Sequence, residues 1–346
     1  MGLKILFISH KFYPDVGGIE VNSEILAAYF KKFGADVRLL TWSTDTTAKN
    51  FNFEVIRNPS VFELFKQFKW ADVVYENNIS LKLSWPQLFF RKPHVIAIRT
   101  WIRRMDGKKA LPDYIKMYWL DKASQVISVS KRIAEVTYPK SEIIGNPYRE
   151  ELFKSYKPIS ERPKDFVFMG RLVSDKGADM AIGLIESLNK LKNLDKLHRL
   201  TLIGDGADRA SLEQRVNQAN LGNQIHFTGI LRGKELVDML NEHKYILIPS
   251  RWEEPFGNVA LEGMACGCLP IVSNGGGLPD AAGKGGIVFE RNSEESLFSE
   301  TKKILNNASY ENRIRSYFDA HLSQHLPEVV AASYFRIIKK SLEIRD

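Results

Sequence analysis

Short apolar runs alternate with segments of helical periodicity along the chain. The first repeat of this pattern has apolar runs at residues 4–8 and 37–40, which enclose a loop with two glycines and a helical pattern over residues 21–33. Gly34 follows that pattern directly and favours the end of a helix. A strand, a glycine loop, a helix and a second strand predict a β-α-β unit, whose two strands are parallel.

The same pattern returns in the second half of the chain. A polar segment with two prolines, residues 154–164, interrupts it and indicates a linker. Buried strands are predicted at residues 73–75, 95–98 and 126–129 before that segment, and at residues 165–169, 200–203, 225–228, 245–248 and 269–272 after it. The predicted fold class is therefore α/β, with two doubly wound domains.

Three regions follow from this pattern. We expect an N-terminal domain over residues 1–153, a second domain over residues 165–325 and a C-terminal helix over residues 326–346. The apolar residues of the last region have helical spacing, so this helix must pack on another surface. Ligands of open α/β sheets bind beyond the carboxyl ends of the strands. We therefore expect the chemistry in a cleft where the loops of both domains meet.

Composition narrows the class of protein. Of the 346 residues, 44% are hydrophobic and 26% are charged, which is typical of a soluble globular chain. No apolar run approaches the ~18 residues of a membrane span, and the apolar start lacks the cleavage site of a signal peptide. The two cysteines, Cys266 and Cys268, form no disulfide framework and no zinc pattern, and they suit a reduced, cytoplasmic compartment. Collagen-like, disordered, transmembrane and disulfide-rich classes are excluded.

Positive charge is concentrated in the first half. Residues 1–150 hold 23 Lys and Arg against 15 Asp and Glu, whereas residues 151–346 hold 26 of each, so the whole net charge of +8 lies in the first 150 residues. The charge is densest over residues 99–132, where aromatic residues interleave with the cations. This segment fits the inner face of an anionic membrane, an acidic acceptor or a solvated surface. Nucleic acid is not expected, because no nucleic-acid-binding motif accompanies the charge.

The most specific motif is EPFGNVALE, residues 254–262, which follows the predicted strand at residues 245–248. Gly257 permits a tight entry into a helix that starts at Asn258. The first N–H groups of a helix lack internal partners and carry partial positive charge, so a diphosphate fits there. Glu254 and Glu262 are carboxylates that suit the vicinal hydroxyls of a sugar or ribose. Taken alone, the two glutamates favour an ordinary charged helix start and a solvated surface side chain.

A second loop, GRLVSDKG at residues 170–177, follows the predicted strand at residues 165–169. Gly170 permits close approach of a ligand to the backbone. Arg171 offers a two-pronged donor and Lys176 a point charge, which together suit a diphosphate. A solvated turn with a salt bridge to Asp175 is the alternative. The spacing differs from that of a Walker phosphate loop.

Two further glycine loops are weaker signals. One, after the first strand, contains Gly17 and Gly18, and the other holds three consecutive glycines at residues 275–277. A glycine turn or a flexible loop accounts for them equally well. The first loop lacks the G-x-G-x-x-G spacing of a dinucleotide site, which disfavours a nicotinamide oxidoreductase.

The order and spacing of these motifs resemble a known family. In this order and spacing, the chain is similar to glycosyltransferase family 4. The motifs that carry the resemblance are the first glycine pair, GRL with KG, LIGDG at residues 202–206, FTG at 227–229, PS at 249–250, the E-x7-E pair and GGLP. The resemblance implies the GT-B fold, in which two Rossmann-like domains face a central cleft and the C-terminal helix docks back on the N-terminal domain. The N-terminal domain would bind the acceptor and the second domain the donor.

The same resemblance implies an activity. The implied activity is that of a retaining hexosyltransferase, which needs no metal or other cofactor. Such an enzyme moves a sugar from a nucleoside diphosphate sugar, commonly a UDP-sugar, to a hydroxyl group. The acceptor would be a glycan or a lipid-linked intermediate, as in the synthesis of cell-surface polysaccharide, lipopolysaccharide or glycolipid. Such an enzyme would be cytoplasmic and could lie peripherally on the membrane.

Residue roles follow from the resemblance by position. Arg171 and Lys176 would neutralise the donor diphosphate, and Glu262 would hold the ribose. Glu254 would face the donor sugar, and catalysis would depend on it together with Arg171 and Lys176. The remaining donor-binding residues are expected to be Gly17, Gly18, Gly170, Ile230, Leu231, Phe256, Gly257, Asn258 and Val259.

One position departs from the family pattern. Members often have a His after the strand that matches residues 95–98, near the reacting carbon, whereas Arg99 and Thr100 follow it here. Either Arg99 reaches the donor, or a neighbour such as Thr100 acts there. Arg103 and Arg104 are further candidates on the acceptor side. The missing His keeps open a second function, that of a nucleotide-sugar-binding protein without transferase activity.

Overall fold

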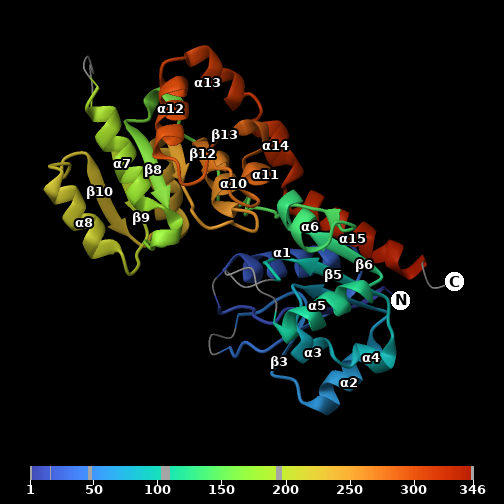
Figure 1. Ribbon diagram of the computed structural model, residues 1–346. Helices are drawn as coiled ribbons and strands as arrows, with labels where there is room; N and C mark the ends of the chain where they lie inside the picture. The colour runs from blue at the N-terminus through green and yellow to red at the C-terminus, as the bar shows by residue number, and fades with distance from the viewer. Residues whose placement is uncertain (1, 16, 46–48, 103–109, 192–196, 344–346) are drawn as a thin grey trace. The chain divides into compact units, whose positions relative to one another are not determined.

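The computed structural model describes residues 2–15, 17–45, 49–102, 110–191 and 197–343. The chain forms two compact units (Figure 1). Unit 1 consists of Met1–Pro147 and Pro327–Asp346, and unit 2 consists of Tyr148–Leu326. Each unit is a parallel sheet with helices on both faces.

Unit 1 contains a seven-stranded sheet in the order β3-β2-β1-β4-β5-β6-β7. The order reverses between β1 and β4, so loops leave the sheet in opposite directions there and open a crevice at the carboxyl ends of the strands. Its strands are β1 (Lys4–Ile8), β2 (Asp36–Thr41), β3 (Glu54–Arg57), β4 (Val73–Asn77), β5 (His94–Ile98), β6 (Gln125–Ser128) and β7 (Glu142–Ile143). Its helices are α1 (Gly18–Lys32), α2 (Val61–Trp70), α3 (Leu81–Ser84), α4 (Gln87–Phe90), α5 (Leu111–Asp121), α6 (Lys131–Thr137) and α15 (Pro327–Glu343).

The alternation of side chains along β1 explains why both faces of this sheet are covered. Ile5 and Phe7 belong to one buried cluster, whereas Leu6 and Ile8 belong to another on the opposite face. Successive side chains of a strand point to opposite faces, so an uninterrupted apolar strand needs cover on both sides. Helices α1 and α15 cover the first face and α2 packs on the second.

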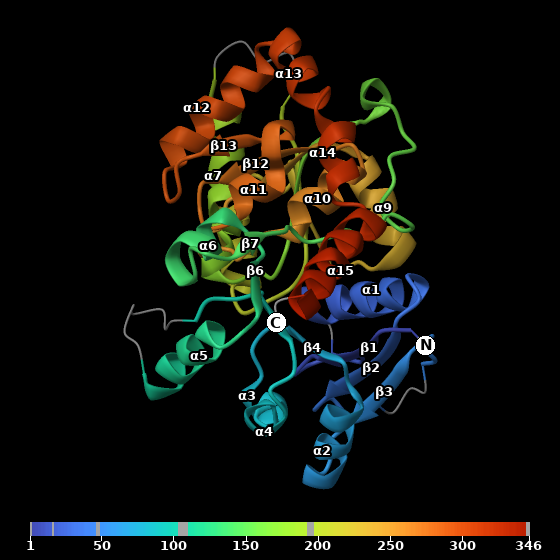
Figure 2. The same ribbon diagram turned by 90° about the vertical axis from the view of Figure 1, so that its right-hand side faces the viewer.

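The last helix, α15, belongs to unit 1 although it follows unit 2 in the sequence. It lies beside α1 (Figure 2) and also contacts β4, β5 and β6. Tyr334 is fully buried and meets the ring of Tyr75 edge to face at 6.0 Å, and Phe335 meets Phe30 at 5.8 Å. The expected docking of the C-terminal helix on the N-terminal unit is thereby confirmed.

Unit 2 repeats the same strand order in six strands, β10-β9-β8-β11-β12-β13, with the reversal between β8 and β11. Its strands are β8 (Lys164–Met169), β9 (Leu200–Ile203), β10 (Ile225–Gly229), β11 (His243–Ile248), β12 (Leu269–Ser273) and β13 (Ile287–Phe289). Its α-helices are α7 (Ala178–Asn189), α8 (Arg209–Gln218), α9 (Gly233–Asn241), α10 (Asn258–Ala265), α11 (Leu278–Ala282), α12 (Glu294–Leu305), α13 (Ala308–Arg315) and α14 (Phe318–Gln324). Short 3-10 turns lie at Ile159–Glu161, Ser174–Lys176 and Gly283–Gly285.

The segment expected to be a linker is instead part of unit 2. Arg162 is 2% exposed, and its guanidinium donates to the carbonyls of Lys157 and His243 at 2.8 Å. The N–H of Tyr156 also donates to the amide oxygen of Asn241 at 2.9 Å. Polar residues and prolines suggested a solvated linker, but these buried hydrogen bonds attach residues 154–164 to the unit. The chain passes between the units at Pro147–Tyr148 and at Leu326–Pro327.

Within the residues described, no helix combines the length and the apolar character that crossing a membrane requires.

Candidate active site

The strand reversal in unit 2 brings two of the predicted motifs together. Residues 170–177 follow β8 and residues 249–257 follow β11, and these strands are neighbours in the sheet. The carbonyl of Asp175 accepts the N–H groups of Arg251 at 2.8 Å and Trp252 at 3.1 Å. The hydroxyl of Ser250 donates to the same carbonyl at 3.1 Å. The two loops therefore form one hydrogen-bonded structure at the crevice of the sheet.

Gly177 allows this close approach. Its φ of +73° lies in the left-handed region, and a Cβ atom at this position would lie 2.1 Å from the carbonyl oxygen of Pro249. Both the backbone conformation and the space therefore require glycine. Gly177 also ends the cation-bearing loop and is the N-cap of α7.

Lys176 and Glu254 form an ion pair between Nζ and Oε1. The Ser250 hydroxyl, whose residue is 1% exposed, lies 3.0 Å from the same Oε1 atom, so its one proton is shared between this carboxylate and the Asp175 carbonyl. The side chains of Lys176 and Glu254 keep 21% and 18% of their exposure, so both are held in place yet remain accessible. Two residues expected to act in catalysis thus meet directly in unit 2.

The triple glycine holds the backbone of Glu254. The N–H of Gly277 donates to the Glu254 carbonyl at 2.7 Å, and Gly276 pairs with Glu254 in a parallel bridge. Gly276 has φ +65°, and a Cβ there would lie 2.1 Å from the Glu254 carbonyl oxygen. This loop therefore positions Glu254.

Helix α10 begins immediately after this pair. Its N-cap is Gly257, no side chain caps its first N–H groups, and its first turn contains no acidic residue. Phe256 is 3% exposed and packs against His325, with 5.6 Å between ring centres. The partial positive charge at this helix end is therefore not neutralised by a side-chain cap or by an acidic residue of the first turn, which suits an anionic ligand beside Asn258 and Val259.

Glu262 lies half-buried one turn further along α10. Burial raises the pKa of its carboxyl group to about 7, an effect that the nearby Arg149 partly offsets. Among the residues described, none donates a hydrogen bond to this carboxylate. A carboxylate without internal donors can accept two hydrogen bonds from vicinal hydroxyls.

The other residues predicted for unit 2 are more exposed. Arg171 is exposed at the start of its loop, next to Gly170, which follows β8 directly. Ile230 is 62% exposed and Leu231 half-buried, and both follow β10. They lie, like the paired residues, in loops at the carboxyl edge of the sheet.

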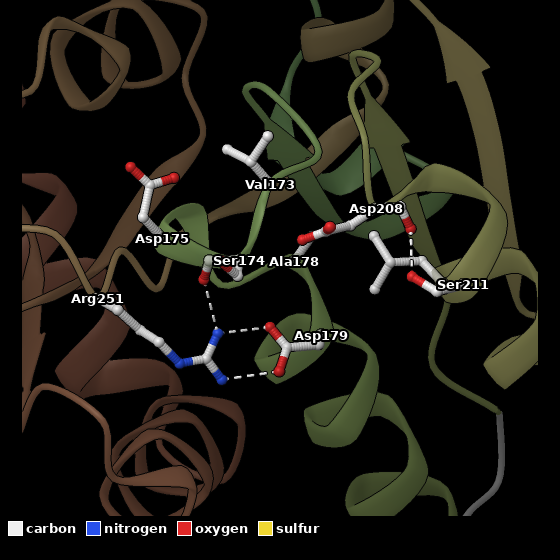
Figure 3. Close-up of a pocket in the computed structure, with 9 residues that line it drawn as sticks. Val173, Ser174, Asp175, Ala178, Asp179, Asp208, Ser211 and Arg251 are labelled. Carbon is white, nitrogen blue, oxygen red and sulfur yellow. Dashed lines mark hydrogen bonds and ion pairs between the residues drawn. The ribbon is translucent and has the colours of Figure 1, made fainter.

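Sequence reasoning missed a second ion pair, which braces the cation-bearing loop. Arg251 donates to both oxygens of Asp179 at 2.6 and 2.7 Å, and it also donates to the Ser174 carbonyl at 3.0 Å (Figure 3). Burial is the largest single influence on Asp179 and would raise its pKa, but the hydrogen bonds and positive charge of Arg251, with a backbone hydrogen bond and the charge of Arg215, together hold the pKa below its usual value. In the sequence, Arg251 only follows the PS motif at residues 249–250, and its partner Asp179 lies on another element, α7.

A pocket of about 370 Å³ lies beside this brace. Residues of the cation-bearing loop, α7, α8 and Arg251 line it, as Figure 3 shows. None of the residues expected to bind the donor lines it. The pocket therefore borders the back of the loop rather than its predicted binding face.

In unit 1, Gly17 and Gly18 begin α1 at the carboxyl end of β1. Gly17 is its N-cap, with extended backbone and no side-chain cap, and Gly18 is its first residue. This helix end lies at the strand reversal of the unit 1 sheet. His10, which lies in the same loop, is exposed, with its Nδ1 3.1 Å from the Ser80 hydroxyl.

Arg99 is 5% exposed and is the centre of a buried polar network in unit 1. Its guanidinium donates to Asn77 and Asn146 at 2.7 Å each and to the Tyr75 hydroxyl at 3.3 Å. It also lies over the Tyr334 ring at 4.9 Å. All three of its nitrogens thus have partners within the unit. Thr100 is half-buried, and Arg103 and Arg104 lie outside the described residues.

Comparison with known proteins identifies the class of this site. Residues 149–319, nearly all of unit 2, match the family model described as glycosyl transferases group 1. The chain is 30% identical over 179 residues to 2-deoxystreptamine N-acetyl-D-glucosaminyltransferase of Niallia circulans, a match that covers 50% of this chain and 44% of that protein. It is 25% identical over 323 residues to an uncharacterized glycosyltransferase of Methanocaldococcus jannaschii, which covers 86% and 87% of the two chains.

Solved structures show the same fold. HepE of Anabaena, solved in complex with UDP, matches 98% of this chain and 100% of its own with a TM-score of 0.80 and 18% identity. Sucrose-phosphate synthase of Thermosynechococcus elongatus matches with a TM-score of 0.76 and 17% identity, over 99% and 100% of the chains. Two parallel Rossmann-like units of this kind are the GT-B fold.

Proposed function

The chain has the GT-B fold and its unit 2 belongs to the glycosyl transferases group 1, and from this premise we propose that the protein transfers a sugar from a nucleoside diphosphate sugar to a hydroxyl acceptor. The observation that carries the proposal is the Lys176–Glu254 ion pair at the uncapped start of α10. It places a fixed cation, a carboxylate and helix N–H groups at one crevice. A sugar diphosphate needs the same three kinds of partner.

Unit 2 supplies the donor contacts in this proposal. Lys176, Arg171 and the first N–H groups of α10 stabilise the charge that develops on the leaving diphosphate, so no metal is required. The ribose hydroxyls donate to Glu262, whose carboxylate has no internal donor. UDP is the proposed nucleotide, which the UDP complex of the similarly folded HepE supports.

Glu254 faces the donor sugar. Its carboxylate accepts from Lys176 and Ser250 through one oxygen, Oε1. The other oxygen is the one we assign to a sugar hydroxyl. Transfer proceeds with retention of configuration: the bond from the anomeric carbon to the diphosphate breaks, the acceptor oxygen forms the new bond, and a leaving-group oxygen takes the acceptor proton.

Unit 1 receives the acceptor, which we propose to be a glycan or lipid-linked molecule with negative charge. The whole positive excess of the chain lies within residues 1–150, and exposed cations attract anions through an unneutralised field. Arg99 does not act on substrate here, because its guanidinium is occupied by Asn77, Asn146 and Tyr75. Its role is to hold the carboxyl ends of β4 and β5 in position.

The occupied Arg99 is also the observation that favours the second candidate, a nucleotide-sugar-binding protein without transferase activity. One experiment separates the two. The protein is screened against nucleotide sugars by thermal shift, because a ligand that binds the native state raises the midpoint. The stabilising donor is then incubated with a library of hydroxyl acceptors and its consumption is measured. Stabilisation with transfer supports the proposal, stabilisation without transfer supports the second candidate, and no stabilisation by any nucleotide sugar contradicts both.

A further inference from the structure

The strand reversal of unit 1 carries an exposed histidine. His10 follows β1 and Ser80 follows β4, and the strand order reverses between these two neighbouring strands. The Nδ1 atom of His10 lies 3.1 Å from the Ser80 hydroxyl. Open α/β sheets bind their ligands at such a reversal, beyond the carboxyl ends of the strands. The imidazole therefore lies where a ligand of unit 1 is expected.

The loop that carries His10 is fixed by hydrogen bonds. The His10 carbonyl accepts from the Trp42 N–H at 3.1 Å and from the Thr41 hydroxyl at 3.2 Å. The Lys11 carbonyl accepts from the buried hydroxyl of Ser9 at 2.7 Å. The side chains of His10 and Lys11, in contrast, are exposed. A ligand at this loop therefore meets a backbone that is already ordered, which lowers the entropic cost of binding.

Ser80 is held in turn from the interior of the unit. It is 4% exposed, and its N–H donates to Oε2 of the fully buried Glu76 at 2.9 Å. The other oxygen of Glu76 accepts from the Trp119 indole N–H at 2.9 Å and lies 2.8 Å from Nε2 of His94. The hydroxyl that meets His10 is therefore held in place. Within the described part of the chain, no residue hydrogen-bonds Nε2 of His10, so this nitrogen is left for a ligand.

Two ammonium groups lie near the same ring. Lys11 adjoins His10 in the loop, and Lys82 belongs to α3, which begins directly after Ser80. Burial and the positive charges of Lys82 and Lys11 lower the pKa of the His10 imidazole, so both ammonium groups are close enough to act on it. Both lysines are exposed, and neither forms an ion pair with an Asp or Glu of the described residues. They therefore supply two unneutralised charges beside a hydrogen-bonding ring.

We propose that His10, Lys11 and Lys82 bind a phosphate ester of the acceptor. Lysine binds phosphate as a point charge, whereas a planar carboxylate is matched by the two-pronged donor of an Arg. Three separate donors also match the three free oxygens of a phosphate monoester. The assignment of this phosphate to the acceptor rests on the proposed sugar transfer. It narrows the negatively charged acceptor to one whose phosphate lies where β1 and β4 end.

The first test is a titration of the full chain with inorganic phosphate, followed through the NMR signal of the His10 imidazole at constant pH and ionic strength. His10→Gln identifies that signal by its loss. Phosphate should shift the signal, and acetate should shift it much less. Lys11→Gln/Lys82→Gln should raise the apparent Kd for phosphate by about ten-fold. Lys11→Arg/Lys82→Arg keeps both charges and should bind phosphate as wild type does.

Two controls accompany this titration. Lys66→Gln/Lys69→Gln removes the same amount of charge from exposed positions on α2 of the same unit and should leave the apparent Kd unchanged. Lys176→Ala should leave the shift of the His10 signal unchanged, because this signal reports on unit 1 and not on phosphate bound in unit 2. Thermal midpoints show that each variant is folded.

The second test uses the donor identified by thermal shift with two kinds of acceptor. One is a soluble phosphorylated glycan, the other is a lipid-linked glycan with phosphate in its link, and each is compared with its phosphate-free counterpart. The acceptor KM should be at least about ten-fold lower when the phosphate is present. Lys11→Gln/Lys82→Gln should remove this difference and leave the donor KM unchanged. The kind of acceptor that shows the difference identifies the source of the phosphate.

The proposal is overturned if phosphate leaves the His10 signal unchanged, or if Lys11→Gln/Lys82→Gln binds phosphate as tightly as wild type. It is also overturned if both phosphorylated acceptors have the same KM as their phosphate-free counterparts. If no acceptor consumes the donor, the proposed function fails, and the phosphate titration still decides whether the anion subsite exists.

Discussion

Lys176 and Glu254 are 78 residues apart in the sequence and form an ion pair at the strand reversal of unit 2. Each is anchored by its own loop, and the Asp175 carbonyl of the first loop accepts the N–H groups of Arg251 and Trp252 in the second. The pair is thus preorganised, with little left to arrange when a charged ligand arrives.

Removing the Lys176 cation should mainly reduce turnover. A single preorganised donor to a developing charge is worth about two to three decades in kcat, so Lys176→Ala should lose about that much. Steady-state kinetics with the donor identified by thermal shift provide the measurement. Lys234→Ala, at an 86% exposed side chain in the same unit, is the control and should keep wild-type kcat. A Lys176→Ala enzyme within about three-fold of wild type would rule out the proposed role.

Glu262 should make nucleotide binding depend on pH. Hydroxyl donors favour the ionised carboxylate, and burial raises the pKa of this group to about 7 in the free protein. UDP affinity should therefore rise between pH 6 and pH 8, by up to about ten-fold. Isothermal titration of wild type and Glu262→Gln gives the comparison. Titration of the diphosphate itself affects binding to both proteins equally. Parallel pH profiles of UDP affinity for wild type and Glu262→Gln would therefore contradict the assignment of Glu262 to the ribose hydroxyls.

The same raised pKa predicts a pH effect on stability without ligand. A carboxyl group whose pKa is higher in the folded than in the unfolded state binds protons more tightly in the folded state. It therefore stabilises the protein at low pH, and this contribution is lost as the pH rises from the ordinary Glu value through about 7. Between pH 5 and pH 8, Tm should fall more steeply for wild type than for Glu262→Gln. Equal slopes in differential scanning calorimetry would show that Glu262 ionises normally.

The Arg251–Asp179 brace should affect donor binding more than turnover. Replacing Arg251 by Met removes two hydrogen bonds to Asp179 and one to Ser174 and should cost about 1 kcal/mol of stability at neutral pH. Because the pKa of Asp179 is lowered, the contribution is present above the ordinary Asp pKa and is lost as the pH falls. The loop that carries Lys176 then loosens, so the donor KM should rise while kcat changes little. A double-mutant cycle with Asp179→Asn isolates the pair, and zero coupling energy would contradict the brace.

Arg99 should act through stability rather than through substrate binding. Arg99→Lys keeps the charge but cannot reach Asn77, Asn146 and Tyr75 together, and it should lower the free energy of unfolding of unit 1 by about 2–4 kcal/mol. Urea denaturation measures this loss, and donor affinity in unit 2 serves as the control. A stable Arg99→Lys protein with a raised acceptor KM would instead mean that Arg99 contacts the acceptor.

The positive charge of residues 99–132 supports one further expectation. Charge reversal at Arg103, Arg104, Lys108 and Lys109 should raise the apparent acceptor KM and leave donor affinity unchanged, since the donor cations lie in unit 2. The effect should weaken as salt screens exposed charges. The matched comparison reverses four cations of unit 1 that lie outside this segment, Lys66, Lys69, Arg91 and Lys92. If the two variants change the acceptor KM equally, the effect comes from net charge and not from this segment.

The sequence predicted all the central strands and one edge strand, β10, and missed the other three edge strands. Every predicted strand is present, with its ends within two residues. The three missed strands, β3, β7 and β13, each lie at an edge of a sheet. An edge strand has one neighbour and is partly solvated, so its apolar run is short and mixed with charge, as in the EVIR sequence of β3.

The candidate site was predictable where its chemistry lies in contiguous motifs. Glycines and charged residues at the ends of predicted strands pointed to Lys176, Glu254 and Glu262. The partners of these residues were not predictable, because hydrogen bonds between loops depend on the packing of the whole unit. The clearest example is Arg99, which the sequence offered beside Thr100 as one of two candidates near the reacting carbon and whose partners Asn77, Asn146 and Tyr334 come from three distant parts of the chain.

Helix α15 has a consequence for the order in which the protein can be made. A ribosome synthesises residues 1–147 before unit 2, yet the helix that covers one face of their sheet emerges only after unit 2. Until then, the aromatic and aliphatic side chains that meet Tyr334 and Phe335 are open to water, and Arg99 lacks the ring over which it lies. Unit 2 is one continuous segment, so it needs no later segment to complete its core. It can fold before unit 1 is complete. A premature stop near residue 326 would therefore spare the unit in which it occurs and damage the one synthesised first.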